Sequence, residues 1–348
     1  MGREAGEAGR RAGLKDVARL AGVSVKTVSN VVNGYVHVAP ATRARVQRAV
    51  AELNYRPNPS ARSLCGGRSG IIALAVPDLR IPYFAELAGL VVAAAEERSL
   101  TVLIDQTGGE RERELRVASG LRTHLIDGLI FSPLALGPED LAARSDDTPM
   151  VLLGERVRPG SADHVAVDNV AAAREATAHR IGLGRHRVAA IGARHDAAGE
   201  TARLRLLGHR QALTEAGLPV HADLVAPVDE YLRADGARAM ARLLDSPEPP
   251  DAVFCGNDLL ALGALRTLYE RGVEVPGRVA VAGFDDIDDG RYGTPSLTTV
   301  APDKRRIAGE AVGLLATRLD GAATGPAREI QVGHRLVPRE STLGRAAR

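Results

Sequence analysis

Side chains near the N-terminus have the types and spacing needed to read double-stranded DNA. Val25, Lys26 and Asn30 would share the exposed face of a short helix. Lysine can reach the acceptor atoms of guanine, asparagine can pair with adenine, and valine can contact the methyl group of thymine. Nearby polar side chains are suited to phosphate oxygens, which fix position without reading sequence. These candidates are Ser24, Thr27, Ser29, Asn33 and Thr42, with His37 in the following turn.

The surrounding sequence predicts the helices that must position these side chains. Apolar residues at helical spacing indicate a first helix over about 14–21, which Gly22 ends in the left-handed conformation of a tight turn. Ser24 is a good N-cap for a second helix, which we expect to end at Gly34. Two short helices joined by such a turn are typical of a helix-turn-helix. A third helix is predicted from about residue 40 to 53, with proline in its first position.

Charge is distributed unevenly along the 348 residues. Residues 1–68 hold twelve Lys or Arg and four Asp or Glu, a net charge of +8, whereas the remaining residues carry a net charge of −6. This asymmetry indicates an arm that binds a polyanion, attached to a neutral-to-acidic body. A disordered basic tail would have the same charge, but the helical pattern argues against it for all except residues 1–12, which we expect to be disordered.

Beyond residue 69, short apolar runs alternate with amphipathic helical stretches, and most runs end in Asp, Asn, Ser or Gly. This pattern predicts an α/β body of parallel sheets covered on both faces, and two such sheets facing a cleft would account for its length. Ligands bind outside the carboxyl ends of parallel strands, so the polar residues that follow these runs are candidate ligand groups. The runs include GIIALAVPD, DGLIFSP, PMVLLGE, HVAVDN, PDAVFCGND and VAVAGFDD.

Several classes of protein lack support in the sequence. Cys65 and Cys255 make neither a disulfide framework nor a metal cluster, and we expect no cofactor and no metal. No apolar run is long enough to span a membrane and the N-terminus has no secretory signal, so we expect a cytoplasmic protein with no membrane partner. No phosphate-binding loop, HExxH or GxSxG motif and no catalytic pair indicates an enzyme.

The segment LKDVARLAGVSVKTVSNVVNG, with VAPATRARVQRAVAELNYRPNPSARSL after it, resembles the DNA-binding headpiece of the LacI/GalR family. The resemblance implies a hinge helix that forms on operator binding, with Asn58, Ala61 and Leu64 at the minor groove. Leu64 matches the leucine that wedges open the central base step and kinks the DNA. The chain departs from the family at two helix caps, where Gly13 and Ala39 replace Thr or Ser.

The body resembles the same family, whose bodies are similar to periplasmic sugar-binding proteins, through TARLRLLGHR, CGNDLLALGAL, VAGFDD and TPSLTTV. Arginine can donate hydrogen bonds in pairs to sugar hydroxyls, aspartate can accept them in pairs, and an aromatic plane can cover the C–H face. Asp and Asn after strands can also simply cap the next helix, so both alternatives stay open. Pro302 stands where the family often has glutamine. The effector-contacting positions implied by the resemblance are Tyr83, Phe84, Thr201, Arg205, Tyr231, Asn257 and Asp285.

These observations predict an all-α headpiece with a body of two doubly wound parallel-sheet subdomains. The expected boundaries are 13–57 for the helix-turn-helix domain, 58–68 for the hinge and 69–348 for the effector-binding and dimerisation body. Within the body, the N-lobe is expected at about 69–168 and 299–327, and the C-lobe at about 169–298 and 328–348.

The resemblance implies a homodimeric transcriptional repressor that binds a palindromic operator of about 14–20 base pairs. We expect a small-molecule inducer, and a carbohydrate in particular, because hydroxyl-pairing residues dominate the matched positions. One alternative is a regulator that needs a corepressor such as a nucleobase. A sugar-binding solute receptor is a second alternative, which the missing signal and the basic N-terminus disfavour.

Overall fold

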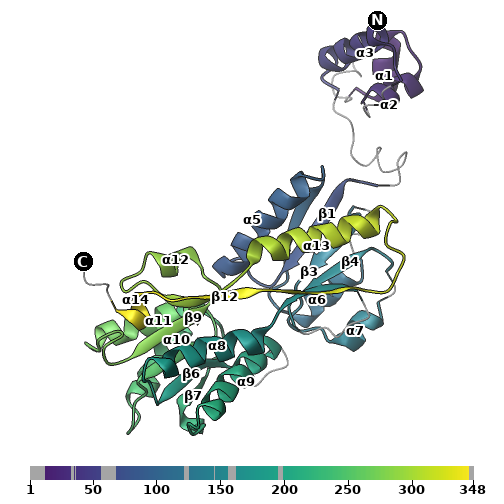
Figure 1. The fold of residues 1–348 in the computed structure, drawn as a ribbon. Coiled ribbons are helices and arrows are strands. Elements are labelled where there is room, and N and C mark those ends of the chain that lie inside the picture. The colour runs from purple at the N-terminus through teal and green to yellow at the C-terminus, as the bar shows by residue number, and fades with distance from the viewer. Residues whose placement is uncertain are drawn as a thin grey trace, which may run out of the picture. The chain divides into compact units, whose positions relative to one another are not determined.

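The computed structural model describes residues 12–32, 35, 37–55, 68–120, 125–144, 146–155, 162–194 and 199–344 (Figure 1). The chain divides into two compact units, Met1–Ser69 and Gly70–Arg348. Almost all of the expected N-terminal tail, and the expected hinge apart from Arg68, lie outside the described residues.

The first unit contains the three predicted helices, α1 (Leu14–Ala21), α2 (Val25–Val32) and α3 (Pro40–Glu52). Its small core is built from aliphatic side chains, among which those of Val17, Val28 and Val46 are fully buried. The helix-turn-helix prediction is therefore confirmed.

Local hydrogen bonds explain where these helices begin and end. Gly22 ends α1 with a φ angle of 63°, as expected for the tight turn. The Ser24 hydroxyl oxygen accepts a hydrogen bond from the backbone N–H of Thr27 at 3.0 Å, which caps α2. Gly13 precedes α1, and its N–H donates to the Asp16 carboxylate at 2.9 Å. Ala39 provides no side-chain cap for α3, as the sequence indicated.

The second unit contains two six-stranded sheets, which form the cores of two lobes. All neighbouring strands of the first sheet are parallel, in the order β11-β5-β4-β3-β1-β2. The second sheet, in the order β12-β10-β9-β8-β6-β7, is parallel except for the antiparallel pair β10 and β12. The strands of the first sheet are β1 (Ile71–Val76), β2 (Thr101–Gln106), β3 (Gly128–Phe131), β4 (Met150–Leu153), β5 (Asp163–Val167) and β11 (Glu329–Val332). Those of the second are β6 (Val188–Ala193), β7 (Val225–Pro227), β8 (Ala252–Cys255), β9 (Ala280–Phe284), β10 (Thr298–Pro302) and β12 (His334–Val337).

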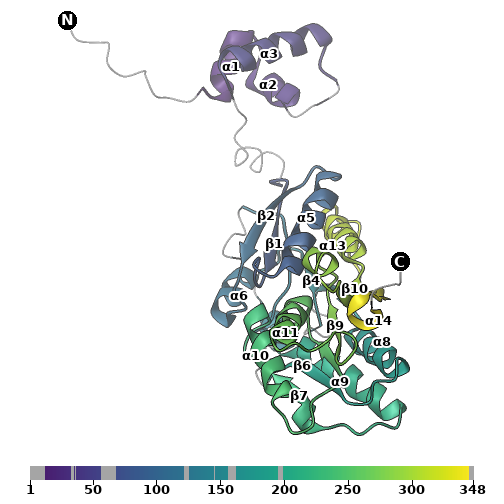
Figure 2. The same ribbon diagram turned by 90° about the vertical axis from the view of Figure 1, so that its left-hand side faces the viewer.

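Helices cover both faces of each sheet, which confirms the predicted α/β architecture. In the first lobe, α5 (Pro82–Glu96) and α13 (Lys304–Leu319) pack on one face and α6 (Arg111–Ala118) on the other (Figure 2). The short helix α7 (Pro138–Ala142) packs on the same face as α6. The second lobe has α10 (Arg233–Leu244) and α11 (Asp258–Glu270) on one face, and α8 (Asn169–Gly182) and α9 (Glu200–Glu215) on the other. Shorter elements are the 3-10 turn η1 (Ala222–Leu224), α12 (Asp288–Arg291) and α14 (Glu340–Leu343). Among the described helices, none combines the length and apolar character that crossing a membrane would require.

The lobes are joined at three crossings, two of which differ from the expected positions. The chain enters the second lobe after β5, as expected. It returns only after β10, so 299–302 belongs to the second sheet rather than to the N-lobe. The last crossing lies at Gly333, because β11 pairs with β5 in the first sheet while β12 pairs with β10. A short apolar run does not reveal its pairing partner when that partner is far away in sequence.

The second lobe buries a cationic side chain in its core. The guanidinium of Arg180, in α8, lies 5.5 Å from the centroid of the Phe254 ring, and its Nη2 donates to the Thr177 hydroxyl at 3.3 Å. Its Nε and Nη1 have no hydrogen-bond partner among the described residues. Burial lowers the pKa of Arg180 to about 9. A buried charge without a partner is destabilising, because it loses its hydration and gains nothing in return.

We therefore expect Arg180→Met to stabilise the protein. Methionine keeps the length of the aliphatic stem while removing the buried charge, and the free energy of unfolding should rise by about 1–4 kcal/mol. Chemical denaturation checks this, with Arg174→Met as the matched control on the same helix. Arg174 forms an exposed ion pair with Glu215, so its loss should change stability by less than about 1 kcal/mol. Equal or lower stability of Arg180→Met would contradict the interpretation.

Candidate functional site

The three candidate base-reading side chains lie on α2. Val25 and Lys26 are exposed, and Asn30 is partly exposed one helical turn beyond Lys26, so these two side chains share a face. Along α2 the first unit thus exposes an apolar side chain, a cation and an amide, which are groups that can contact base edges in the major groove.

The candidate phosphate-contacting residues differ in how exposed their side chains are and in whether other contacts hold them. Ser24 is exposed, but its hydroxyl caps α2 and lies 2.9 Å from that of Thr27. His37 is exposed and packs edge-on against Tyr35. Ser29 and Thr42 are partly buried on α2 and α3. Asn33 and the hinge candidates Asn58, Ala61 and Leu64 lie outside the described residues.

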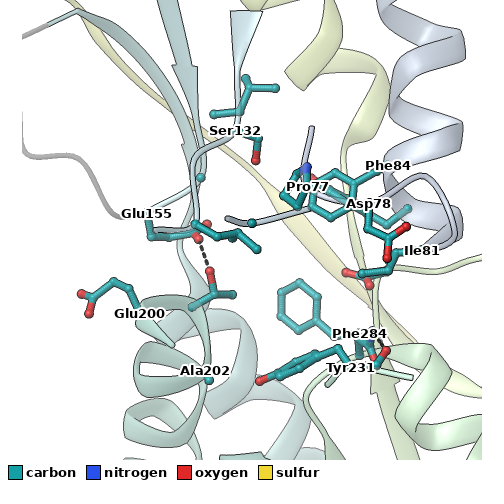
Figure 3. A pocket seen from close by; sticks show the side chains of 18 of the residues that line it. Pro77, Asp78, Ile81, Phe84, Ser132, Glu155, Glu200, Ala202, Tyr231 and Phe284 are labelled. Carbon is teal, nitrogen blue, oxygen red and sulfur yellow. Dashed lines mark hydrogen bonds between the residues drawn. The ribbon is translucent and has the colours of Figure 1, made fainter. Parts of the chain in front are cut away.

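A cleft with a volume of about 390 Å³ lies in the second unit, between its two lobes. It is lined by residues that follow strands of both sheets, including Asp78 after β1, Ser132 after β3 and Glu155 after β4. Figure 3 shows Glu155, Tyr231 and Phe284 reaching this cleft from different elements. Polar residues that follow strands of both sheets therefore meet in one cleft, and their role as ligand groups stays a prediction. All seven predicted effector residues line the cleft: Tyr83, Phe84, Thr201, Arg205, Tyr231, Asn257 and Asp285.

Arg205, in α9, is held rigidly at the cleft wall. Its guanidinium carbon lies 3.5 Å from the centroid of the Phe284 ring, so the planar group stacks on the ring. Its Nε donates to the side-chain oxygen of Asn169 at 2.6 Å, and its Nη1 donates to the carbonyl of Gly256. Within the described residues no hydrogen bond occupies Nη2, so these N–H groups are available to a ligand.

Asp285, directly after β9, presents a buried acceptor. The residue is only 6% exposed, and its carboxylate accepts no hydrogen bond from any described residue. Burial raises the pKa of Asp285 to about 7, although the nearby charges of Arg205 and Lys304 act in the opposite direction. A ligand whose hydroxyl groups donate hydrogen bonds to such a carboxylate replaces the water that burial removed, and so stabilises its charged form.

Glu155 is a cleft residue that the predicted set omitted. Its carboxylate accepts hydrogen bonds from the Thr201 hydroxyl at 2.7 Å and from the Asn169 amide at 2.5 Å. Glu155 follows β4 in the first lobe, whereas Thr201 belongs to α9 in the second, so these bonds connect the lobes. The run PMVLLGE marked this position as a candidate through its place after a strand, but nothing local showed what Glu155 would contact.

Asn257 and Tyr231 have structural partners as well as a place in the cleft. The side-chain oxygen of Asn257 accepts a hydrogen bond from the Leu260 N–H at 2.9 Å, and thus caps α11. Its amide group donates to the Tyr231 carbonyl at 3.1 Å, while the Tyr231 hydroxyl donates to the carbonyl of Gly192. The capping alternative is therefore confirmed for Asn257, which also positions Tyr231. Phe284, which supports Arg205, was missed because its apolar side chain has no distinguishing local signal.

The remaining aromatic candidates lie at the start of α5. Tyr83 and Phe84 pack edge to face with their ring centroids 5.2 Å apart, so the cleft has apolar surface from the first lobe as well. No described cluster of three or more His, Cys, Asp or Glu side chains is arranged to hold a metal ion. The cleft is lined by polar and charged side chains together with aromatic rings.

Two family models match the chain. One, described as "Bacterial regulatory proteins, lacI family", matches residues 13–58, and the other, "Periplasmic binding protein-like domain", matches residues 177–342. The HTH-type transcriptional regulator DegA of Bacillus subtilis is 32% identical, over 85% of this chain and 88% of that protein. The HTH-type transcriptional repressor CytR of Escherichia coli is 33% identical, over 90% of this chain and 91% of that protein.

Solved structures agree with these relatives. A putative LacI-family regulator from Sanguibacter keddieii is 50% identical with a TM-score of 0.73, and covers 80% of this chain and 100% of its own. The transcriptional regulator CelR in complex with cellobiose is 33% identical with a TM-score of 0.69, over 95% and 100% of the two chains. The lac repressor dimer bound to operator and the anti-inducer ONPF is 28% identical with a TM-score of 0.84, over 96% and 100%.

The buried carboxylate of Asp285 leads to a prediction about stability and pH. Its pKa is about 7 in the folded protein and 3.8 as an unperturbed group. Between these values the folded state binds a proton that the unfolded state has released, so this group lowers stability as pH rises from about 4 to about 7. We expect Asp285→Asn to remove that dependence and to stabilise the ligand-free protein at pH 8 by about 1–3 kcal/mol.

Chemical denaturation between pH 4 and 8 measures this effect. The control is Asp245→Asn, because Asp245 lies on the surface in an ion pair with Arg271 and should contribute little. A pH slope in Asp285→Asn identical to that of the unmodified protein would show that Asp285 does not titrate as described.

Proposed function

Because the chain belongs to the lacI family of bacterial regulatory proteins, we propose that it is a dimeric repressor that leaves a palindromic operator when a neutral sugar binds in the cleft. The observation that carries this proposal is the pairing of Arg205 and Asp285 in one cleft. Among the described residues, Arg205 offers unused N–H donors on a rigid guanidinium, and Asp285 offers a largely buried acceptor that no hydrogen bond occupies. Vicinal sugar hydroxyls satisfy both at once.

The charge of the cleft favours a neutral ligand. Six carboxylate side chains line it, against the three arginines Arg80, Arg194 and Arg205. Arg80 is itself paired with Asp78 at 2.7 Å, which leaves less positive charge for an anion. A phosphorylated sugar or a nucleotide would meet net repulsion here, whereas hydroxyl groups can donate to the carboxylates. The carboxylates belong to Asp78, Glu155, Glu200, Asp229, Glu230 and Asp285.

The size and apolar surface of the cleft also suit a sugar. A volume of about 390 Å³ lies at the small end of the range typical of small-molecule sites. The ring of Tyr231, with Tyr83 and Phe84 from the first lobe, provides apolar surface for the C–H face of a pyranose or furanose. A ribose operon repressor of Escherichia coli, 34% identical, and the cellobiose complex of CelR belong to the same family and support a sugar ligand.

The DNA partner is recognised through the first unit. Val25, Lys26 and Asn30 contact base edges in the major groove, and the polar residues around them contact phosphates. The likeness to a lac repressor dimer on its operator supports both a dimer and this mode of binding. Leu64 opens the central base step from the minor groove. Ligand binding alters the angle between the lobes and hence the separation of the paired hinges, so operator and ligand reciprocally change each other's affinity.

A thermal-shift screen of neutral mono- and disaccharides, beginning with ribose and cellobiose, tests the ligand. A sugar at one hundred times its Kd should stabilise the protein by about 2.7 kcal/mol, and the same sugar should release it from its selected operator. Glucose 6-phosphate and adenine are the controls. If adenine instead raised operator affinity, the protein would be a corepressor-dependent regulator, and the sugar proposal would fail.

Replacement of Leu64 tests the hinge. We expect Leu64→Ala to weaken binding to the selected operator at least tenfold, because alanine is too short to wedge a base step apart, while sugar binding stays unchanged. Fluorescence anisotropy on operator duplexes measures the first effect, and the thermal shift with sugar measures the second. Unchanged operator affinity would refute the wedge role of Leu64.

A further inference from the structure

The body contains a single lysine, at a crossing between the lobes. The chain uses arginine for nearly all of its 45 basic residues, and lysine occurs only at positions 15, 26 and 304. Lys304 is the first residue of α13, at the point where the chain returns from the second lobe to the first. Its side chain is 14% exposed, so its charge is largely removed from water.

The ammonium group of Lys304 has three hydrogen-bond acceptors that belong to both lobes. It forms an ion pair with the Oε2 atom of Glu86, which lies on α5 in the first lobe. It also donates to the backbone carbonyls of Asp285 at 2.9 Å and Asp286 at 3.0 Å, in the second lobe. An ammonium has three N–H donors, and all three are satisfied here. The planar, wider guanidinium of an arginine does not suit three oxygens that converge on one point.

The carbonyls that Lys304 holds belong to a strained turn. Asp285 and Asp286 have φ angles of 113° and 50°, a region that residues other than glycine seldom occupy. Such conformations persist only where surrounding contacts enforce them, and they are common at ligand sites. Asp258 supports the same turn from beneath, since its carboxylate accepts from the Ile287 N–H at 2.9 Å and from the Thr299 hydroxyl at 2.6 Å.

Glu86 contacts the same turn a second time. Its Oε1 atom accepts a hydrogen bond from the backbone N–H of Asp288 at 3.4 Å. The pair of Glu86 and Lys304 therefore reaches Asp285, Asp286 and Asp288 of the second lobe from helices packed together in the first. A separate hydrogen bond between the lobes joins the Glu155 carboxylate to Thr201.

We propose that Lys304, paired with Glu86, is a positioning residue that holds Asp285 in its ligand-binding conformation and links this turn to the first lobe through hydrogen bonds. When a ligand binds to the Asp285 carboxylate, these hydrogen bonds couple its binding to the relative placement of the lobes. This inference rests on the proposed function, in which Asp285 binds the effector. Neither Lys304 nor Glu86 is among the side chains of the hydrophobic cores, so we expect their replacement to leave the core packing of both lobes in place.

Substitutions that remove the hydrogen bonds of Lys304 and Glu86 test this proposal in the full-length protein. We expect Lys304→Met and Glu86→Gln each to accelerate amide hydrogen exchange in the segment 285–291 at least tenfold and to weaken binding of the sugar probe at least tenfold. Arg305→Met and Glu96→Gln are matched controls at exposed positions on the same two helices, and both should resemble the unmodified protein. The probe is cellobiose or ribose, whichever stabilises the unmodified protein more.

The scarcity of lysine provides a direct spectroscopic readout. Lysine labelled with ¹³C at Cε gives three lysine signals, and the signal lost in Lys304→Met belongs to Lys304. We expect this signal to move in Glu86→Gln. In the unmodified protein it should also move when the probe is added, while those of Lys15 and Lys26 stay in place. In Asp285→Asn the response to the probe should disappear.

The outcomes separate the two proposals. If no sugar binds the unmodified protein, the proposed function fails, and the exchange rates alone decide whether Lys304 holds the turn. Unchanged exchange in Lys304→Met and in Glu86→Gln would overturn the positioning role, whether or not a sugar binds. Faster amide hydrogen exchange combined with unaltered affinity for the probe would also overturn it, because the contacts of Lys304 and Glu86 would then have a structural role only.

Discussion

The carboxylate of Asp285 is largely buried and accepts no hydrogen bond from the described residues, and contacts from both lobes hold the turn that carries it. The turn after β9 has positive φ angles at two consecutive aspartates, a conformation that the chain does not favour by itself. Asp258 and Thr299 support this turn from within the lobe, and Lys304 supports it from the other lobe. A ligand with suitable hydroxyl groups replaces the hydration that burial removed. It thereby offsets the unfavourable free energy of burying this carboxylate.

The same cleft shows how ligand binding and lobe placement can be coupled by ordinary hydrogen bonds. Arg205 bonds to Asn169, Asn169 bonds to Glu155, and Glu155 bonds to Thr201, so one network leads from the ligand donor in the second lobe to the first. The pair of Glu86 and Lys304 makes a second connection between the lobes. Each network includes a residue that is proposed to contact the ligand. Binding of the ligand to these residues would therefore alter the contacts between the lobes. Coupling of this kind requires no separate signalling element.

The first unit presents a different balance of forces. Its core consists of a few small aliphatic side chains, and its helices depend on caps that are partly weak, with glycine before α1 and alanine before α3. Small units of this size are only marginally stable, so their contacts with DNA contribute to their order as well as to recognition. The positive charge of residues 1–68 favours any DNA, whereas the side chains exposed on α2 are those proposed to distinguish one sequence from another.

The sequence by itself determined the features that depend on neighbouring residues. Helical spacing, Gly22 and the Ser24 cap located the helix-turn-helix, and the apolar runs that end in polar residues located the strands and the edge where the cleft forms, because these signals act over a few residues. The resemblance of whole blocks then pointed to Arg205 and Asp285. Only the tertiary structure decided which sheet β10 and β11 join, that Phe284 supports Arg205, and that Glu155 and Lys304 connect the lobes. It alone showed that Arg180 is buried without its full set of partners. These contacts join residues far apart in the chain, and no local pattern of residue types encodes which distant atoms will meet.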